Sequence, residues 1–158
     1  MGKIKLGVLL PTRGLLLGEE QPPNADRIIR MAERVEAAGL DSVWVGDSIF
    51  AKPRLDSIAL LGGLAMQTER LRMGPACFAS TPLRPALQLA YQWFSLDFIS
   101  NGRTIFVPCQ GEAAPGGGRF HHEFKALGIE PKSRMRRMEE AIEVMRLTSS
   151  VKEASYQG

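Results

Sequence analysis

The stretch AERVEAAGLDSVWVGDS, residues 32–48, decides the fold class of this protein. Its first half continues a helical repeat of apolar residues that begins near Ala25, and Gly39 is placed to end that helix. Its second half, residues 41–47, is short and rich in β-branched residues, which predicts a buried strand. A helix followed directly by an apolar strand is the repeating unit of a parallel α/β fold.

The same alternation extends in both directions along the chain. The predicted strands cover residues 4–10, 41–47, 71–78 and 104–107, and the predicted helices cover residues 25–38, 55–68, 85–99, 120–127 and 132–147. Apolar strands joined by helices form a parallel sheet with right-handed crossovers. Two architectures fit, an open doubly wound sheet and part of a (β/α)8 barrel. No GxGxxG turn follows the first strand, which counts against the dinucleotide-binding form of the open sheet.

Length and composition predict one globular domain. The 158 residues are 44% apolar and 23% charged, which is the ordinary range for a folded domain. We assign the strand–helix units to residues 1–147 and a frayed polar tail to residues 148–158. The loop at 108–118 ends in a glycine triplet, which is typical of a flexible lid or of solvent-exposed slack.

Charge and cysteine content indicate which partners and which cellular compartment to expect. The net charge is +3 and the basic residues are scattered, so no nucleic-acid partner is predicted. No apolar run is long enough to span a membrane, and the first residues resemble a strand rather than a signal peptide. In such a chain, Cys77 and Cys109 indicate free thiols in a reducing cytoplasm.

Four stretches carry a family resemblance. They are AERVEAAGLDSVWVGDS (32–48), LAMQTERLRMG (64–74), PLRPALQLAYQWFSLDFISNGR (82–103) and EFKALGIEPKSRMRRMEEAIEVMRL (123–147). In order and spacing they resemble the luciferase-like monooxygenase family over nearly the whole chain. The resemblance implies enzymes that use reduced flavin with oxygen, or a deazaflavin coenzyme, to oxidise varied substrates. It also implies a (β/α)8 barrel about twice as long as this chain, so that residues 1–147 form the N-terminal half of a TIM-type barrel.

A half-barrel would leave its first and fourth strands with open edges. The elements after strands seven and eight, where such barrels commonly bind the cofactor phosphate, would be missing. Either two copies complete a barrel-like pair, or the product is a truncated or remodelled gene with impaired function. We favour a homo-oligomer formed through the open barrel edges, because a half-barrel exposes apolar surface.

The candidate site lies at the carboxyl ends of the strands, where barrel enzymes bind their ligands. The residues at these positions are Thr12, Arg13, Asp47, Ser48, residues 77–81 and residues 109–111. The resemblance implies FMN or a deazaflavin as cofactor, with contacts expected at Asp47, Ser48, Cys77, Phe78, Ala79, Ser80, Cys109 and Gly111. No catalytic residue is assigned, and no metal ligand is expected, because His121 and His122 are adjacent in a helix and point apart.

Several of these residues also have a purely structural interpretation. Asp47 would form a hydrogen bond to a flavin edge or a substrate group, or else form one within a helix cap or loop. Ser48 stands where many family members carry a histidine, and a hydroxyl cannot act as a base near neutral pH. Residues 77–81 resemble the segment whose backbone packs against the isoalloxazine ring, or they are ordinary core and turn residues.

Arg84, just beyond this segment, would either bind an anionic group or form an exposed salt bridge, and the salt bridge is the simpler interpretation. The two cysteines are expected to be buried free thiols.

Two functions from different classes are consistent with the sequence. The first is a luciferase-like oxidoreductase, in which the chain positions a small-molecule substrate and a flavin or deazaflavin and excludes water while the cofactor supplies the redox chemistry. The second is a non-catalytic half-barrel that self-associates or pairs with a complete homologue as an interaction module. The sequence does not choose between flavin and deazaflavin.

Overall fold

The computed structural model of the protein describes residues 4–13, 24–112, 119–150 and 155–157. Within these ranges, three parallel strands form a sheet in the order β1 (Gly7–Leu9), β2 (Ser42–Gly46) and β3 (Arg72–Cys77). Gly7 pairs with Ser42, and Ser42 pairs with Arg72, with a register shift only between Val45 and Gly46. The parallel α/β class predicted from the sequence is confirmed.

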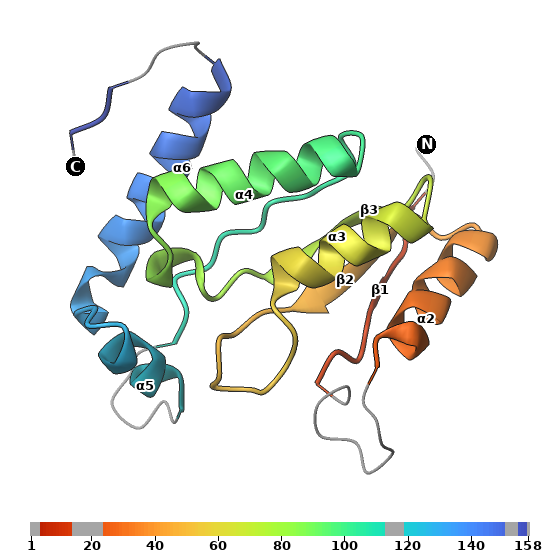
Figure 1. Cartoon of the computed structure of the whole chain (residues 1–158), viewed down its shortest axis with the longest axis horizontal. Helices are drawn as coiled ribbons and strands as arrows, with labels where there is room; N and C mark the ends of the chain where they lie inside the picture. Colours follow the sequence, from red (N-terminus) through yellow and green to blue (C-terminus); the bar gives the residue numbers. More distant parts are fainter. Residues whose placement is uncertain (1–3, 14–23, 113–118, 151–154, 158) are drawn as a thin grey trace.

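Helices connect the strands and cover one face of the sheet. They are α2 (Asp26–Ala37), α3 (Ser57–Gln67), the short 3-10 helix η1 (Thr81–Leu83), α4 (Ala86–Ile99), α5 (Arg119–Ala126), the 3-10 helix η2 (Pro131–Ser133) and α6 (Arg134–Ser150). Figure 1 shows α3 and α4 along the sheet, with α6 beside the start of α4 and α5 at the same end of the molecule. No helix in the described ranges is both long and apolar enough to cross a membrane.

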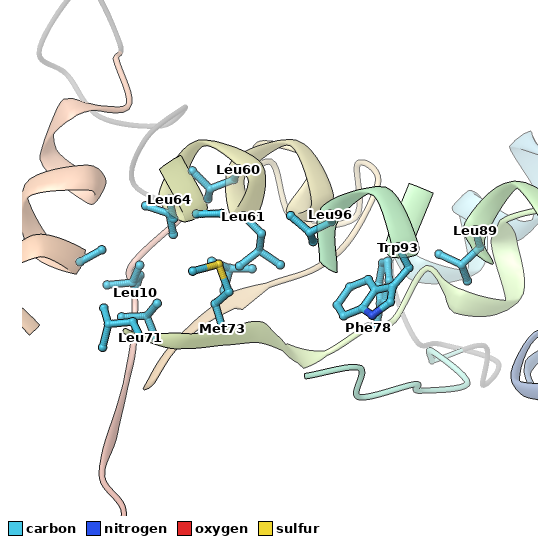
Figure 2. Packing of buried hydrophobic residues seen from close by; sticks show 14 of the residues in the cluster. Leu10, Leu60, Leu61, Leu64, Leu71, Met73, Phe78, Leu89, Trp93 and Leu96 are labelled. Atoms are coloured by element: carbon cyan, nitrogen blue, oxygen red, sulfur yellow. The ribbon is translucent and has the colours of Figure 1, made fainter. Parts of the chain in front are cut away.

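The core lies between the sheet and these helices. Val43 and Val45 of β2 and Met73 of β3 are fully buried against α3. In Figure 2, Leu61 of α3 lies next to Met73, and Trp93 of α4 lies against Phe78. The rings of Phe78 and Trp93 are 5.7 Å apart between centroids. This side of the sheet therefore supplies the packing that stabilises the fold.

The opposite face of the sheet is open in the part of the chain that the structure describes. Side chains alternate along a strand, so Leu9 and Trp44 point away from the buried residues Val43 and Val45. Leu9 is 62% exposed. The apolar residues of the first strand, which suggest a buried strand, are therefore not covered on this face. In a closed barrel this face would be the interior.

Residues 104–107, predicted as the fourth strand, run beside β3 without forming a regular strand. Isolated bridges join Met73 to Thr104 and Phe78 to Pro108. The N–H of Ile105 donates to the carbonyl of Met73 at 2.8 Å. The ladder stops there because the next donor on β3 would be Pro75, which has no N–H. The predicted regular strand was wrong for this reason, although the chain follows the expected path.

The C-terminal helix is longer than predicted. It continues past Leu147 to Ser150, so residues 148–150 are helical rather than frayed. Farther along, the Tyr156 hydroxyl donates a hydrogen bond to Oε2 of Glu143 at 3.0 Å. The glycine triplet of the predicted lid and residues 151–154 and 158 of the predicted tail lie outside the described residues. The assignment of residues 1–147 as one domain stays a prediction.

Candidate functional site

Asp47 connects the ends of two neighbouring strands. It directly follows β2, and its side chain is buried. Its Oδ1 accepts a hydrogen bond from the Ser57 hydroxyl at 2.8 Å, and its Oδ2 accepts one from the backbone N–H of Ser80 at 2.7 Å. The carboxylate thus fixes the start of α3 against the segment after β3. The loop hydrogen bond considered for Asp47 is present, and contact with a flavin stays a prediction.

Ser48 closes the loop that follows β2. Its buried hydroxyl donates to the carbonyl of Lys52 at 2.7 Å and accepts from the N–H of Lys52 at 3.3 Å. Both bonds lie within five consecutive residues, so they shape the loop locally. This hydroxyl therefore positions the loop between Asp47 and α3.

The residues after β3 divide between the core and the strand ends. The Phe78 side chain is fully buried beside Trp93 and Phe106, so only its backbone can contact a ligand on the open face. Ser80 is also buried, and its hydroxyl accepts from Nε of Arg84 at 2.9 Å. Nη2 of Arg84 pairs with Oδ2 of Asp56 at 2.5 Å. The exposed salt bridge expected at Arg84 is present, with the Asp56 side chain 45% exposed and the Arg84 side chain 17% exposed.

Cys77 and Cys109 meet at the ends of β3 and the segment beside it. The bridge between Phe78 and Pro108 aligns the two segments, so that the Cys109 thiol influences the pKa of Cys77. Partial burial, together with the Cys109 thiol, raises the pKa of Cys77 to about 12. Both cysteines are free, as expected, but Cys77 is exposed and Cys109 is partly so. The expectation of buried thiols was wrong because the sheet face beside them is open.

Gly111 brings the chain back against Ala79. Its φ is +67°, a conformation that favours glycine, and a Cβ here would lie 2.9 Å from the Ala79 carbonyl oxygen. The predicted contact residues therefore meet in three pairs at the strand ends: Asp47 with Ser80, Cys77 with Cys109, and Ala79 with Gly111.

Two residues at this edge were not predicted from the sequence. Glu123 of α5 is only 1% exposed, and its Oε1 accepts from the backbone N–H groups of Phe50 at 2.6 Å and Ala51 at 2.7 Å. Arg54, in the loop before α3, lies over Gly46 so closely that a Cβ on Gly46 would overlap its Nη1 atom. Glu123 carried a usable signal, because it lies at the same helical spacing as Phe120 and Phe124. Arg54 carried none, since it belongs to no periodic segment.

A hollow of about 390 Å³ opens at the ends of β1 and β2. Its lining consists of Leu9, Leu10, Pro11, Thr12, Arg13, Gly46 and Arg54. A larger hollow, of about 630 Å³, lies between the start of α4 and α6, on the helix side of the molecule. The smaller hollow lies at the carboxyl ends of the strands, where barrel enzymes bind ligands, and Thr12 and Arg13 are the predicted site residues that line it.

The sequence model of the luciferase-like monooxygenase family matches residues 4–158. This chain belongs to the luciferase-like monooxygenase family. It is 28% identical to limonene 1,2-monooxygenase of Rhodococcus erythropolis over 123 residues, which are 74% of this chain and 29% of that protein. It is 30% identical to the F420-dependent glucose-6-phosphate dehydrogenase of Amycolatopsis mediterranei over 128 residues, or 75% of this chain and 36% of that protein.

A solved structure shares the fold of this luciferase-like chain. It is the oxygenating constituent of 3,6-diketocamphane monooxygenase from Pseudomonas putida, in complex with FMN. The TM-score is 0.78 at 18% identity, over 98% of this chain and 41% of that one. The chain thus spans less than half the length of each of these three proteins. The fold is a partial barrel of the luciferase-like type, as the sequence predicted.

The open face of this luciferase-like partial barrel combines apolar surface with polar groups. Leu9 offers exposed apolar surface, and Trp44 beside it is partly exposed. Polar groups at the strand ends flank this surface, among them Thr12 and Arg13.

Proposed function

We propose that this chain is the cofactor-facing part of a luciferase-like oxidoreductase that binds FMN or a deazaflavin at the carboxyl ends of its strands. The observation that carries the proposal is the convergence of three contact pairs, Asp47 with Ser80, Cys77 with Cys109 and Ala79 with Gly111, at one end of the open face. Barrel enzymes bind ligands at that end. The relatives named above also include an F420-dependent enzyme and an FMN complex.

The positions of the residues suggest separate roles for the cofactor and for the chain. When bound, the cofactor would supply the redox chemistry. Leu9 and Trp44 would contact its ring, and the backbone at 78–80, held by Asp47, would border it. Glu123 would fix the loop at Phe50 and Ala51 as one wall of the site. The non-catalytic interaction module is the weaker hypothesis, since the relatives named above are all described as monooxygenases or dehydrogenases.

Fluorescence titration of the full chain with FMN and with F420 tests this function. A Leu9→Lys variant places a charge on the open face, and a Met135→Lys variant places the same charge at an exposed apolar residue on α6. Saturable binding of one cofactor should be weakened by Leu9→Lys and unchanged by Met135→Lys. A folded protein that binds neither cofactor would overturn the proposal.

We also propose that two copies associate through their open edges, in the cytoplasm. Ile4 and Leu6 lie beside edge strand β1 and are both exposed, which favours burial against a partner. Light scattering should then give the mass of a dimer, and Leu6→Lys should return the mass of a monomer. A monomeric wild-type protein at high concentration would contradict this arrangement.

A further inference from the structure

Two arginines from different segments face the same hollow at the strand ends. Arg13 follows β1, and Arg54 lies in the loop between β2 and α3. Both line the hollow of about 390 Å³, together with the buried residue Thr12. Two positive charges at one small opening repel each other unless an anion lies between them.

Arg54 is held in place by its surroundings. Its guanidinium lies against Gly46, where a Cβ would overlap Nη1, and its Nε donates to the carbonyl of Lys52 at 3.3 Å. Glycine at the end of β2 therefore leaves room for the guanidinium on the open face. The planar group is positioned before any ligand arrives, which reduces the entropy lost on binding.

Asp47 and Glu123 act on Arg54 by their charge, but both direct hydrogen bonds to neutral groups rather than to the arginine. Asp47 accepts from Ser57 and Ser80, and Glu123 accepts from Phe50 and Ala51. The ion pair found within the described ranges joins Arg84 to Asp56, and in those ranges no carboxylate lies within 4.0 Å of Arg13 or Arg54. Among the described residues, therefore, neither arginine of the hollow forms an ion pair.

The electrostatic environment of Arg54 agrees with this arrangement. Burial lowers its pKa, and the charge of Arg13 lowers it further, against the opposing influence of Asp47 and Glu123. The positively charged form of Arg54 is thus destabilised by its position. An anion placed between the two guanidinium groups would reverse that effect.

We propose that Arg13 and Arg54 form an anion-binding subsite at the carboxyl ends of β1 and β2, which takes a carboxylate or phosphate group of a small-molecule ligand. The subsite deepens the proposed function and rests on it for the identity of that ligand, which is either an anionic substrate or the phosphate-bearing part of the cofactor. Guanidinium groups bind both anions through paired hydrogen bonds, which a lysine cannot reproduce.

Calorimetric titration of the full chain with inorganic phosphate and with succinate tests the subsite directly. Arg54→Gln and Arg13→Gln should each weaken binding about tenfold, the loss of one charge-assisted contact. Arg30→Gln removes the same charge from an exposed position on α2 and should leave the affinity within about twofold, the scale of a remote surface charge. Equal losses in all three variants, or no loss in any, would overturn the subsite.

A second variant separates binding from folding. Gly46→Ala forces the guanidinium of Arg54 aside, which a flexible side chain can do without unfolding the strand. It should therefore reduce anion affinity as Arg54→Gln does. Arg54→Gln itself should leave the unfolding temperature without anion unchanged or raised, because it removes an unpaired, partly buried charge. An unchanged anion affinity in folded Gly46→Ala would contradict the assigned position of Arg54.

Titration with FMN and riboflavin identifies the source of the anion. If Arg54→Gln weakens FMN and leaves riboflavin unchanged, the subsite takes the cofactor phosphate. If it weakens succinate and neither flavin, the subsite takes an anionic substrate. Flavin binding that is indifferent to both arginines, without phosphate or succinate binding, would overturn the subsite and leave the proposed function standing. Anion binding without any flavin binding would overturn the proposed function and leave the subsite standing.

Discussion

The backbone N–H of Ser80 donates a hydrogen bond to Oδ2 of Asp47 at 2.7 Å, and so joins the end of β3 to the end of β2. In Asp47→Asn, one carboxylate oxygen is replaced by an NH2 group, which cannot accept a hydrogen bond. One buried donor loses its partner, and we expect unfolding to become easier by about 2 kcal/mol, measured by urea denaturation. Ser57→Ala removes only the second contact and should cost about 1 kcal/mol. If Asp47→Asn unfolded at the same urea concentration as the wild type, Asp47 would not be what joins the ends of β2 and β3.

Glu123 should control the order of the loop before α3. In Glu123→Ala the N–H groups of Phe50 and Ala51 lose their acceptor, whereas the side-chain oxygen of Glu123→Gln can take the place of Oε1. We expect the alanine variant to lose about 3 kcal/mol of stability and the glutamine variant about 1 kcal/mol. Amide hydrogen exchange at residues 50 and 51 should be accelerated most in the alanine variant. Equal protection in both variants would show that Glu123 does not hold this loop.

The alternation of apolar segments was enough to predict the parallel α/β class and the position of the strand ends. The sequence even contained the reason why the fourth strand is irregular, since Pro75 cannot donate to the ladder. Arg54 could not be found in this way, because its position over Gly46 depends on the path of a loop. The openness of the face that bears Leu9 and Cys77 likewise depends on how the elements are arranged, and no local pattern encodes it.

Cys77 should react slowly with alkylating reagents although it is exposed. Its pKa is raised to about 12 by partial burial and by the Cys109 thiol, so little of the reactive thiolate exists at neutral pH. Cys109→Ala removes the second cause and should accelerate iodoacetamide labelling of Cys77. Peptide mass spectrometry would follow the rate at each cysteine. A Cys77 rate in the wild type equal to that of a small free thiol would contradict this environment.

Glu36 should make stability depend on pH below the ordinary range of a glutamate. Its carboxylate accepts from the backbone N–H groups of Glu69, Arg70 and Leu71. Burial alone would raise its pKa, but the three N–H groups outweigh burial and lower it from the usual 4.5. A lowered folded-state pKa means that the contribution of Glu36 is complete above the unfolded pKa and is lost as pH falls through the folded one.

The comparison with Glu36→Gln makes this dependence measurable. At neutral pH the wild type should be more stable than Glu36→Gln by about 1 kcal/mol, the scale of hydrogen bonds to a partly exposed carboxylate. That gap should narrow steadily below pH 4.5, because protonation of Glu36 in the wild type removes the same charge. Glu33→Gln, an exposed change on the same helix, should show no such gap. A gap between the wild type and Glu36→Gln that stays constant down to about pH 3 would mean that packing of Glu36, rather than its charge, secures the start of β3.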